Sequence, residues 1–337
     1  MVTGGAGFIG SNLAARLLGE GWEVIVFDNL SRKGSKKNLL WLKESYKTQK
    51  LYIETKDVRD FAAIKEVVGK TEVIFHLASQ VAVTASVENP REDFEINALG
   101  SFNVLEAARA SGHKPIVIYA SSNKVYGSMD TAGVKMGAKR YLLTDFKDGI
   151  DEHYPLDFHS PYGCSKGAAD QYTRDYFRIY GIPTVVFRQS CIYGPRQMGV
   201  EDQGWVAHFA ISSILGRQVT IYGDGKQVRD LLYIDDLIDA YLKAVEKISK
   251  VRGEVFNIGG GSKNSLSILE YLEYLEKKLK KSIKIRFVRK WRSGDQKVFI
   301  SNNSKLGKMV GWTPKVAALS GIDRLVDWIE VNKRIFL

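Results

Sequence analysis

Three glycines near the start of the chain constrain its fold more than any other feature. Gly4, Gly7 and Gly10 recur at every third position, and an apolar-periodic segment at residues 11–18 follows them. Glycines in this pattern allow a tight turn, a close approach of the backbone to a pyrophosphate and close packing of a helix on a sheet. The N-terminus of that helix then faces the phosphates. The pattern predicts a strand, a glycine-rich loop and a helix that together bind a dinucleotide.

The acidic residue expected of such a site follows at the right distance. The strand predicted at residues 23–27 ends in Asp28, and a carboxylate about twenty residues beyond the glycines binds the adenosine ribose. This carboxylate would repel a 2′-phosphate, so the sequence favours NAD over NADP, although Arg32 nearby leaves NADP open. A second acid, Asp57, follows the predicted strand at 51–54. It is either an acceptor for the adenine amino group or the cap of its own turn.

Buried strands alternate with amphipathic helices through the first half of the chain. Three continuous apolar segments are typical of strands in a parallel sheet, and they lie at residues 72–78, 115–120 and 183–188. We expect an α/β fold with a Rossmann-type doubly wound parallel sheet over residues 1–187, to which a segment at 230–258 returns. Residues 188–229 and 259–337 are expected to form a smaller α/β substrate-binding lobe. His76, inside the first apolar segment, is expected to be a core residue rather than a catalyst.

A tyrosine and a lysine are the candidates for chemistry. Tyr162 and Lys166 stand four residues apart in a segment that is typical of a helix, so they share one face. A neighbouring ammonium favours the phenolate form of a tyrosine. Lowering the pKa from about 10 to about 7 requires roughly 4 kcal/mol, which Lys166, a helix N-terminus and an oxidised nicotinamide together can supply. The pair alone is weak evidence and fits a half-buried tyrosine over a solvated lysine better than chemistry.

A serine at the end of a predicted strand is the candidate partner of this tyrosine. Ser122 follows the apolar segment 115–120, and the carboxyl ends of parallel strands are where α/β sheets bind ligands. We expect Ser122 to share a substrate proton with Tyr162, or else to cap its own turn.

Composition restricts the class of protein further. The chain carries 49 basic and 38 acidic residues, a net charge of +11, which fits either solvated faces or the attraction of nucleic acid or a nucleotide diphosphate. With no recognisable nucleic-acid motif, a locally basic ligand cleft is favoured. Cys164 and Cys191 lie far apart, so no disulfide framework or metal site is expected, and a reducing cytoplasm is the expected location. No apolar run approaches the roughly 20 residues that a membrane span needs.

Taken together, these segments resemble the extended short-chain dehydrogenase/reductases of the nucleotide-sugar epimerase/dehydratase type, over essentially the whole chain. The motifs in the family's order are Gly4-x-x-Gly7-x-x-Gly10, Asp28-Asn29, Tyr162 with Lys166, Tyr193-Gly194-Pro195 and Arg292-x-Gly294-Asp295. The resemblance implies NAD as cofactor, a nucleotide-diphosphate sugar as substrate and a homo-oligomer, either a dimer or a tetramer. The implied catalytic residues are Tyr162, Lys166 and Ser122. The implied cofactor-binding residues are Gly4, Gly7, Phe8, Ile9, Asp28, Asn29, Ser31, Arg32, Asp57, Val58, Leu77, Ala78, Gln80, Asn97, Tyr162 and Lys166.

The resemblance also implies a set of substrate contacts. They are Ser122, Asn123, Lys124, Cys191, Arg196, Gln203, Arg229, Arg292 and Asp295. Arg229 and Arg292 would grip the diphosphate by forked hydrogen bonds, whereas Cys191 stands where most relatives use an asparagine to hold the substrate. The polar, aperiodic residues 128–156 are expected to form a flap over the sugar, and residues 221–230 are expected to form a hairpin-like element.

The same comparison narrows the reaction. Related 4,6-dehydratases carry an Asp-Glu pair where this chain has Asn123-Lys124, and an amide with an ammonium cannot replace that acid and base. Epimerisation by oxidation and re-reduction at one carbon is what remains. Segments that include residues 27–34, 123–127 and 225–230 resemble the CDP-paratose 2-epimerase (CDP-tyvelose epimerase) branch, which implies inversion at C2 with Tyr162 as the base.

Two rival readings of the function stay open. One is 4-epimerisation of a UDP-hexose. The other, from a different class, is a dinucleotide-sensing or RNA-associated protein that does not turn over a substrate. The net charge of +11 would then reflect binding to a polyanion.

Overall fold

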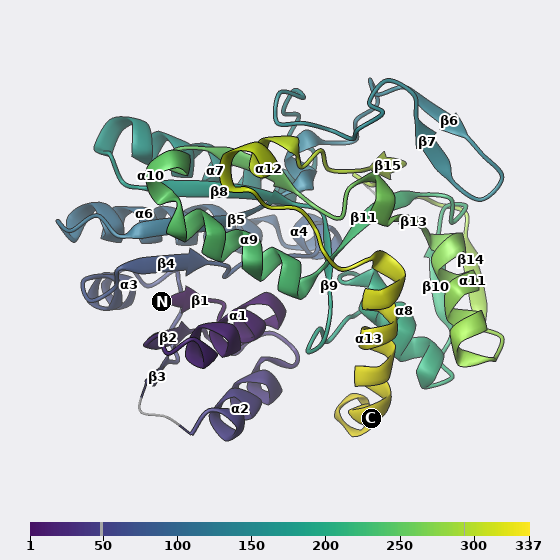
Figure 1. Cartoon of the computed structure of the whole chain (residues 1–337), viewed down its shortest axis with the longest axis horizontal. Coiled ribbons are helices and arrows are strands. Elements are labelled where there is room, and N and C mark those ends of the chain that lie inside the picture. The colour runs from purple at the N-terminus through teal and green to yellow at the C-terminus, as the bar shows by residue number, and fades with distance from the viewer. Residues whose placement is uncertain (48–49, 293) are drawn as a thin grey trace.

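A seven-stranded parallel sheet organises the computed structural model, which describes residues 1–47, 50–292 and 294–337 (Figure 1). The strands lie in the order β12-β8-β5-β4-β1-β2-β3. Their bounds are β1 Val2–Thr3, β2 Val24–Phe27, β3 Leu51–Glu54, β4 Val73–His76, β5 Ile116–Ser122, β8 Thr184–Gln189 and β12 Val255–Ile258. The order runs outward in both directions from the β1–β4 pair, so the topological switch point, where such sheets bind ligands, lies there. The Rossmann-type sheet expected from the sequence is confirmed.

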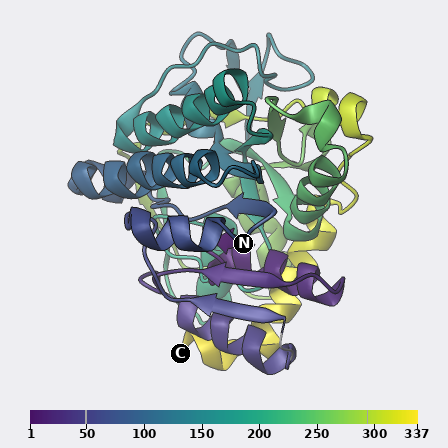
Figure 2. The same ribbon diagram turned by 90° about the vertical axis from the view of Figure 1, so that its left-hand side faces the viewer.

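Helices cover both faces of this sheet (Figures 1 and 2). On one face α3 packs on α6 and α6 on α7, while α1 contacts α2 and α9 on the other. The bounds are α1 Phe8–Gly19, α2 Ser35–Ser45, α3 Phe61–Val68, α4 Val83–Glu88, α5 Pro90–Phe94, a π-helix Glu95–Leu99, α6 Gly100–Ala110, α7 Ser160–Tyr180, α9 Ile234–Glu246, α10 Ile248–Val251 and α12 Ser304–Val310. The segment 230–258, expected to return to the sheet, supplies α9 and β12.

The sequence explains this double covering. Neighbouring strand residues point to opposite faces of a sheet, and here both faces are apolar. Ile74 and Val117 belong to the cluster that includes residues of α3 and α6. Their neighbours Phe75 and Ile118 belong to the cluster that includes residues of α1 and α9. A strand that is apolar at every position, as the sequence shows, is therefore buried on both sides.

The remaining elements form smaller sheets beside the large one, on the right of Figure 1. Their strands are β9 Cys191–Tyr193, β10 Val219–Tyr222, β11 Val228–Tyr233, β13 Ser265–Ser267, β14 Ile285–Val288 and β15 Val298–Phe299, with helices α8 Trp205–Ile214, α11 Ile268–Leu279 and α13 Ala318–Val331. The hairpin expected at residues 221–230 is wrong. β10 pairs with β14, and β11 pairs with β9, β13 and β15. The buried Leu231 and Leu232 of β11 lie opposite β9, so long-range packing decides the pairing.

The flap expected at residues 128–156 is also wrong. The segment contains an antiparallel hairpin of β6 Val134–Met136 and β7 Tyr141–Leu143, and none of its residues, all of them described, lines either cavity reported below. Arg140 anchors the hairpin to α11 through an ion pair of 2.8 Å with Glu270. Ile150 and Tyr154 are buried in a cluster with Phe299, which lies far away in the sequence. These distant contacts fold a segment whose own pattern looks irregular.

Candidate active site

One cavity, of about 430 Å³, opens at the carboxyl ends of strands around the switch point. Its walls include most of the residues that the resemblance assigns to the cofactor, and we call it the cofactor cleft. Those wall residues are Gly4, Gly7, Phe8, Ile9, Asp28, Asn29, Ser31, Arg32, Asp57, Val58, Leu77, Ala78, Gln80, Tyr162 and Lys166. Their placement is consistent with a dinucleotide site, while each individual binding role stays a prediction.

The glycine loop fits the pyrophosphate of a dinucleotide. Gly4 has φ +65°, and a Cβ there would lie 2.8 Å from the backbone nitrogen of Ala78. A Cβ on Gly10 would collide with the carbonyl oxygen of Gly4. No side chain caps the N-terminus of α1, so its first amide groups are left for an anion. Only glycines leave room for this close turn, and the residues present therefore fit NAD.

Asp28 lies at the end of β2 and shapes the loop as well as the cleft. Its carboxylate accepts hydrogen bonds from the backbone nitrogens of Ala6 at 3.0 Å and Leu30 at 2.8 Å. Burial raises the pKa of Asp28, and these backbone donors oppose that rise. Asp57 caps its own turn through the backbone nitrogen of Arg59 at 2.9 Å, and the Arg59 guanidinium holds the pKa of Asp57 at about 2. Both acids line the cleft.

Asn97 lies behind the cleft wall and is not among its lining residues, which corrects its expected direct contact. Its side chain is 1% exposed. The Oδ1 atom accepts from the backbone nitrogen of Gln80 at 2.9 Å, and Nδ2 donates to Asp93 at 3.0 Å and Ser165 at 3.2 Å. All its polar capacity is used within the protein, so Asn97 holds the wall residue Gln80 in place.

Arg32 reaches across the cleft. The side chain leaves the loop after Asp28, and its Nη2 atom donates to Oε1 of Gln203 at 2.9 Å. Gln203 lines both the cofactor cleft and a second cavity. Arg32 is therefore turned toward the substrate side, whereas the sequence suggested a place near the adenosine ribose.

Tyr162 stands where the two cavities meet, since it lines both. It lies in the first turn of α7 and is 8% exposed. Burial raises its pKa to about 12, with a further rise from Asp93, while a hydrogen bond with Ser122 and the charge of Arg32 oppose the rise. The lowering expected from Lys166 is absent among the protein's own groups, because desolvation outweighs the charges that the chain supplies.

Lys166 lies one turn further along α7 and points its ammonium elsewhere. Nζ donates to the carbonyl oxygen of Ala120 at 2.6 Å and lies 4.5 Å from the centre of the Tyr119 ring. Burial lowers the pKa of Lys166 to about 7.

His76, expected to be a core residue, is confirmed as one. It is 2% exposed, and its ring contacts Thr3 at 2.7 Å and Ser101 at 2.9 Å.

The second cavity, of about 270 Å³, holds most of the predicted substrate contacts, and we call it the sugar cavity. The predicted residues in its walls are Ser122, Asn123, Lys124, Cys191, Gln203, Arg229, Arg292 and Asp295. Asp295 lies 2.5 Å from Arg229 and 3.6 Å from Lys124. Burial lowers the pKa of Lys124 to about 8, against the pull of Asp295. Burial alone would raise the pKa of Asp295, but Arg229 and Lys124 hold it below its usual value.

The sugar cavity also has walls that the sequence reasoning did not assign. Glu201, Tyr222 and Thr84 are among them. Arg292 lies over the Tyr222 ring at 4.2 Å and donates to the carbonyl oxygen of Glu201 at 2.9 Å. These residues come from separate elements, so no local pattern in the sequence brings them together.

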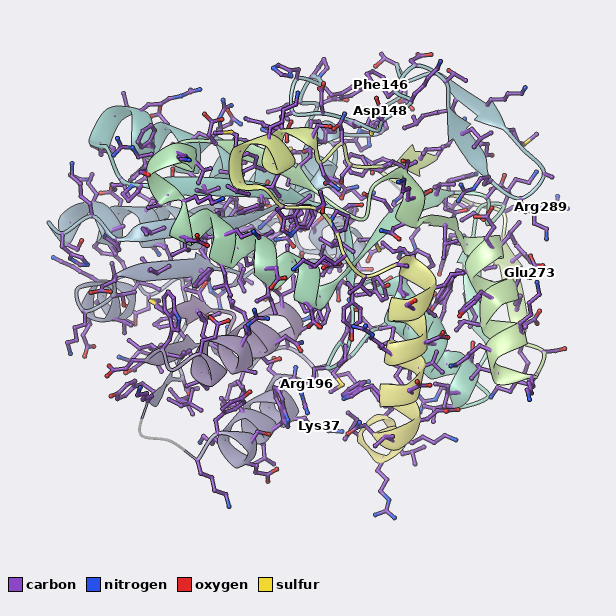
Figure 3. The ribbon with its side chains drawn as sticks, in the orientation of Figure 1. Lys37, Phe146, Asp148, Arg196, Glu273 and Arg289 are labelled. Atoms are coloured by element: carbon purple, nitrogen blue, oxygen red, sulfur yellow. The ribbon has the colours of Figure 1, made fainter. Side chains whose placement is uncertain are left out.

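Arg196 is the predicted substrate contact that the structure places elsewhere. Its guanidinium lies 3.3 Å from the centre of the Trp41 ring and 5.9 Å from that of Trp328. It lines neither cavity, and Figure 3 shows it beside α2, near Lys37. The expectation of a substrate contact is therefore corrected: Arg196 connects α2 with α13 by stacking on their tryptophans.

Two further findings concern metal sites and membrane-spanning helices. Within the described residues, no three or more His, Cys, Asp and Glu side chains group so that they could hold a metal ion. No helix in that part of the chain has both the length and the apolar content for a membrane span.

Comparison with known proteins agrees with this geometry. CDP-paratose 2-epimerase of Salmonella typhi is 45% identical over 336 residues, which cover 97% of this chain and 98% of that protein. A structure of UDP-glucose 4-epimerase from Thermotoga maritima with UDP-glucose is 31% identical, with a TM-score of 0.83 and 98% of each chain covered. The enzyme of that name from Thermus thermophilus, in complex with NAD, is 31% identical, with a TM-score of 0.81 and the same coverage.

The family assignment follows from a match to a sequence model of a protein family. The sequence model described as "NAD dependent epimerase/dehydratase family" matches residues 1–259, more than half of the chain. Its range includes the glycine loop, Asp28, Ser122 and the Tyr162–Lys166 pair. NAD is accordingly the cofactor, and the chain belongs to the NAD-dependent epimerase/dehydratase family.

Proposed function

We propose that this protein epimerises a nucleotide-diphosphate sugar, with the conversion of CDP-paratose to CDP-tyvelose by inversion at C2 as the favoured reaction. The observation that carries the proposal is the position of Tyr162 in the wall shared by the cofactor cleft and the sugar cavity. A group there reaches both the cofactor and a sugar carbinol. The choice of CDP-paratose is supported by the 45% identity with the Salmonella typhi enzyme.

Each residue of the site has a definite task in this reaction. Bound NAD supplies the hydride acceptor and donor, together with a positive charge beside the phenol. Tyr162 holds the proton that leaves the sugar hydroxyl, and Ser122, which lines the sugar cavity with Tyr162, lowers the pKa of that phenol. Because the protein's own groups leave the pKa of Tyr162 at about 12, the phenolate depends on positive charge gained when the site fills.

The sugar cavity fits epimerisation better than elimination of water. Arg229 and Arg292 line this cavity, and we expect their guanidinium groups to bind the diphosphate. Nδ2 of Asn123 donates to Gln296 at 2.9 Å and Nζ of Lys124 donates to the carbonyl oxygen of Gly294 at 2.9 Å. Each nitrogen carries further hydrogens that can be donated to the sugar. An amide and an ammonium do not form the acid–base pair that elimination needs.

The alternative reaction is 4-epimerisation of a UDP-hexose. It is supported by the likeness to the Thermotoga maritima structure with UDP-glucose. Assays with CDP-, UDP- and GDP-sugars, followed by NMR of the inverted carbon, separate the two reactions. We expect turnover of the CDP-sugar with inversion at C2. Inversion at C4 of a UDP-hexose would establish the alternative. RNA binding that weakens with salt, without turnover of any sugar, would instead favour the non-catalytic reading.

The base is tested by Tyr162→Phe with the NAD content measured. Removing the phenolic oxygen deletes the proton acceptor, so we expect turnover to fall by about a thousandfold or more while NAD remains bound. The matched control is Tyr172→Phe, on the same helix but 50% exposed, which should keep wild-type turnover. Activity of Tyr162→Phe within tenfold of wild type would exclude the base role.

We further propose that the enzyme acts in the cytoplasm as a homo-oligomer, a dimer or a tetramer. Support comes from large apolar side chains exposed on α6 and α7, namely Phe102, Tyr172, Ile179 and Tyr180. Light scattering of the purified protein, with Ile179→Asp as the variant, measures the expected assembly and its loss. A monomer in the wild type would contradict it.

A further inference from the structure

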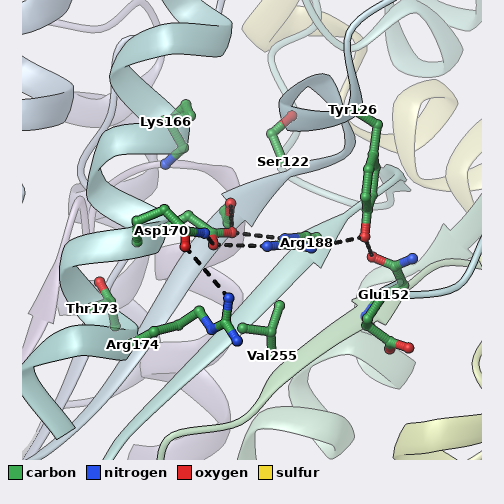
Figure 4. A network of polar contacts seen from close by, with 12 residues as sticks. Ser122, Tyr126, Glu152, Lys166, Asp170, Thr173, Arg174, Arg188 and Val255 are labelled. Carbon is green, nitrogen blue, oxygen red and sulfur yellow. Dashed lines mark hydrogen bonds and ion pairs between the residues drawn. The ribbon is translucent and has the colours of Figure 1, made fainter. Parts of the chain in front are cut away.

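A buried ion pair connects β8 to α7, the helix that carries Tyr162 and Lys166 (Figure 4). Arg188 of β8 and Asp170 of α7 are 2% and 0% exposed at their side chains. Nε and Nη2 of Arg188 donate to the two carboxylate oxygens of Asp170 at 2.9 and 3.0 Å. The third guanidinium nitrogen, Nη1, donates to the hydroxyl of Tyr126 at 3.0 Å. The guanidinium is thus fixed at all three nitrogens.

Asp170 is the residue that Lys166 would be expected to bind. The two stand four positions apart on α7, the spacing at which a lysine and a carboxylate pair along a helix, and Figure 4 shows them on successive turns. The ammonium of Lys166 instead donates to the carbonyl oxygen of Ala120 at 2.6 Å. Ala120 lines the cofactor cleft, so this contact keeps the ammonium at the cleft.

The carboxylate of Asp170 has no acceptor site left for Lys166. Besides the two bonds from Arg188, Oδ2 accepts from the hydroxyl of Ser121 at 2.8 Å, and Oδ1 accepts from Nε2 of Gln171 at 2.8 Å. A carboxylate has about four acceptor positions, and four donors fill them here. Arg188 supplies half of these bonds and the balancing charge.

We propose that Arg188 is a positioning residue for the reaction: by holding both oxygens of Asp170, it prevents Asp170 from capturing Lys166 and so keeps the Lys166 ammonium at the cofactor cleft. This inference rests on the proposed function for its kinetic consequence, but not for the position of Lys166. An arginine suits the task because its planar fork binds both oxygens at once, which a lysine cannot do.

Two other charged groups act on Lys166 and Asp170: Asp93, which raises the pKa of Lys166 as Asp170 does, and Arg174, which interacts with Asp170. Asp93 of α5 accepts hydrogen bonds from Ser165 at 2.5 Å and Asn97 at 3.0 Å. Tyr119 of β5 lies under the ammonium, and burial raises its pKa well above the usual range. Burial lowers the pKa of His76 of β4 to about 3, so it is neutral. Tyr162 shares the face of α7.

The first test is structural. Crystal structures of Arg188→Met and of the double variant Asp170→Asn/Arg188→Met are compared with the wild type. In Arg188→Met the ammonium of Lys166 should leave Ala120 and pair with Asp170. In the double variant it should remain at Ala120, because the competing carboxylate is gone. A Lys166 that stays at Ala120 in Arg188→Met, with Asp170 charged and unpaired, would overturn the proposal whatever sugar the enzyme uses.

The second test uses the sign of a pH shift. In Arg188→Met the Lys166 ammonium is neutralised by Asp170 and supports the Tyr162 phenolate less, so the acid limb of the kcat–pH profile should move up. In Asp170→Asn the unbalanced Arg188 charge should move it down, and the double variant should return near the wild type. We expect kcat of Arg188→Met to fall at least tenfold with KM within threefold, and affinity for NADH, followed by fluorescence, to fall in parallel.

The controls separate positioning from folding. Arg140→Met removes a half-buried ion pair between the β6–β7 hairpin and α11 at a residue that lines neither cavity, and should lower stability without moving the acid limb. If Arg188→Met does not fold, Asp170→Asn and the double variant still carry the test. Shifts of the same sign in both single variants, or no downward shift in Asp170→Asn, would refute the proposal. If no sugar is turned over, the crystal structures and NADH affinities decide it alone.

Discussion

The cofactor cleft and the sugar cavity are built in opposite ways. The cofactor cleft is shaped by backbone, because its glycine loop closes so tightly that a Cβ on Gly10 would collide with Gly4. The sugar cavity is shaped by charged side chains from separate elements, and these side chains pair with one another. Arg229 binds Asp295 at 2.5 Å, and Arg292 lies 3.5 Å from Asp202. One cavity is fixed by its fold, and the other is held by exchangeable ion pairs.

This difference determines how each cavity should respond to change. A backbone cradle has no alternative arrangement, so a single added methyl group should abolish its function. Ion pairs between side chains can be exchanged, so a diphosphate takes the arginines from their acidic partners at a cost in desolvation. Effects in the sugar cavity should therefore be graded and dependent on pH and salt. The predictions below run from the largest expected effect to the smallest.

The largest effect is expected from Gly10→Ala. The new Cβ would meet the Gly4 carbonyl oxygen, so the loop must move and its backbone donors lose the pyrophosphate. Loss of two such charge-assisted hydrogen bonds predicts NAD affinity reduced by about a hundredfold or more, measured by calorimetry. The control is Gly69→Ala, where a Cβ meets ordinary contacts at 3.5 Å. Equal NAD affinity in both variants would show that the cradle is not fixed.

A graded effect is expected from the two arginines of the sugar cavity. Arg229 has a side chain only 12% exposed, whereas Arg292 is 25% exposed and lies near three acidic or carbonyl groups of residues 201–202. Arg229→Gln should raise KM about a hundredfold and Arg292→Gln about tenfold, with kcat little changed, since charge-assisted bonds contribute about 1.5–3 kcal/mol.

Steady-state kinetics measures both changes. Arg91→Gln, at a side chain 89% exposed, is the control and should leave KM unchanged. A fall in kcat with KM unchanged would instead place these arginines in the chemical step, which contradicts this contrast between the two cavities.

The contrast between the cavities also explains what the sequence could predict. One short segment contains Gly4, Gly7, Gly10 and Asp28. Their spacing directly predicts a strand, a turn and a helix. The Tyr162–Lys166 pair is likewise local, because a helix sets the distance between them. The large sheet and the cofactor cleft were therefore predictable from local patterns and resemblance.

Contacts between distant segments were not predictable in this way. β10 pairs with β14, some sixty residues away in the chain. Nothing in the local sequence at 221–230 indicates that β10 pairs there rather than in the expected hairpin. Glu201 and Tyr222 reach the sugar cavity only because their elements meet there. The pKa of Tyr162 is raised by burial. Burial of a side chain cannot be read from the charged residues that are near it in the sequence.

A smaller effect is expected from pH. Burial lowers the pKa of Lys124 to about 8, so its ammonium is present at pH 7 and is lost as the pH rises above 8. Affinity for a CDP-sugar should then fall roughly tenfold between pH 7 and 9. A tenfold fall corresponds to the loss of about 1.4 kcal/mol of attraction between the ammonium and the ligand. Calorimetry should find Lys124→Met weaker at pH 7 and nearly flat with pH, and Lys135→Met, on the exposed hairpin, unchanged. A flat wild-type profile would mean that the Lys124 ammonium does not contact the bound CDP-sugar.

The smallest effect on activity is expected from Arg196→Gln, and it decides between two interpretations of one residue. Resemblance assigns Arg196 to the substrate, and loss of a substrate contact would raise KM about tenfold. The structure places its guanidinium on the Trp41 ring, so the variant should keep KM within twofold of wild type. Instead, unfolding by urea should show a free energy lowered by about 1–2 kcal/mol, the loss of a stacked cation and its packed stem. Arg196 lies outside both cavities and is expected to stabilise the packing of α2 against α13. A raised KM would instead show that Arg196 contacts the substrate.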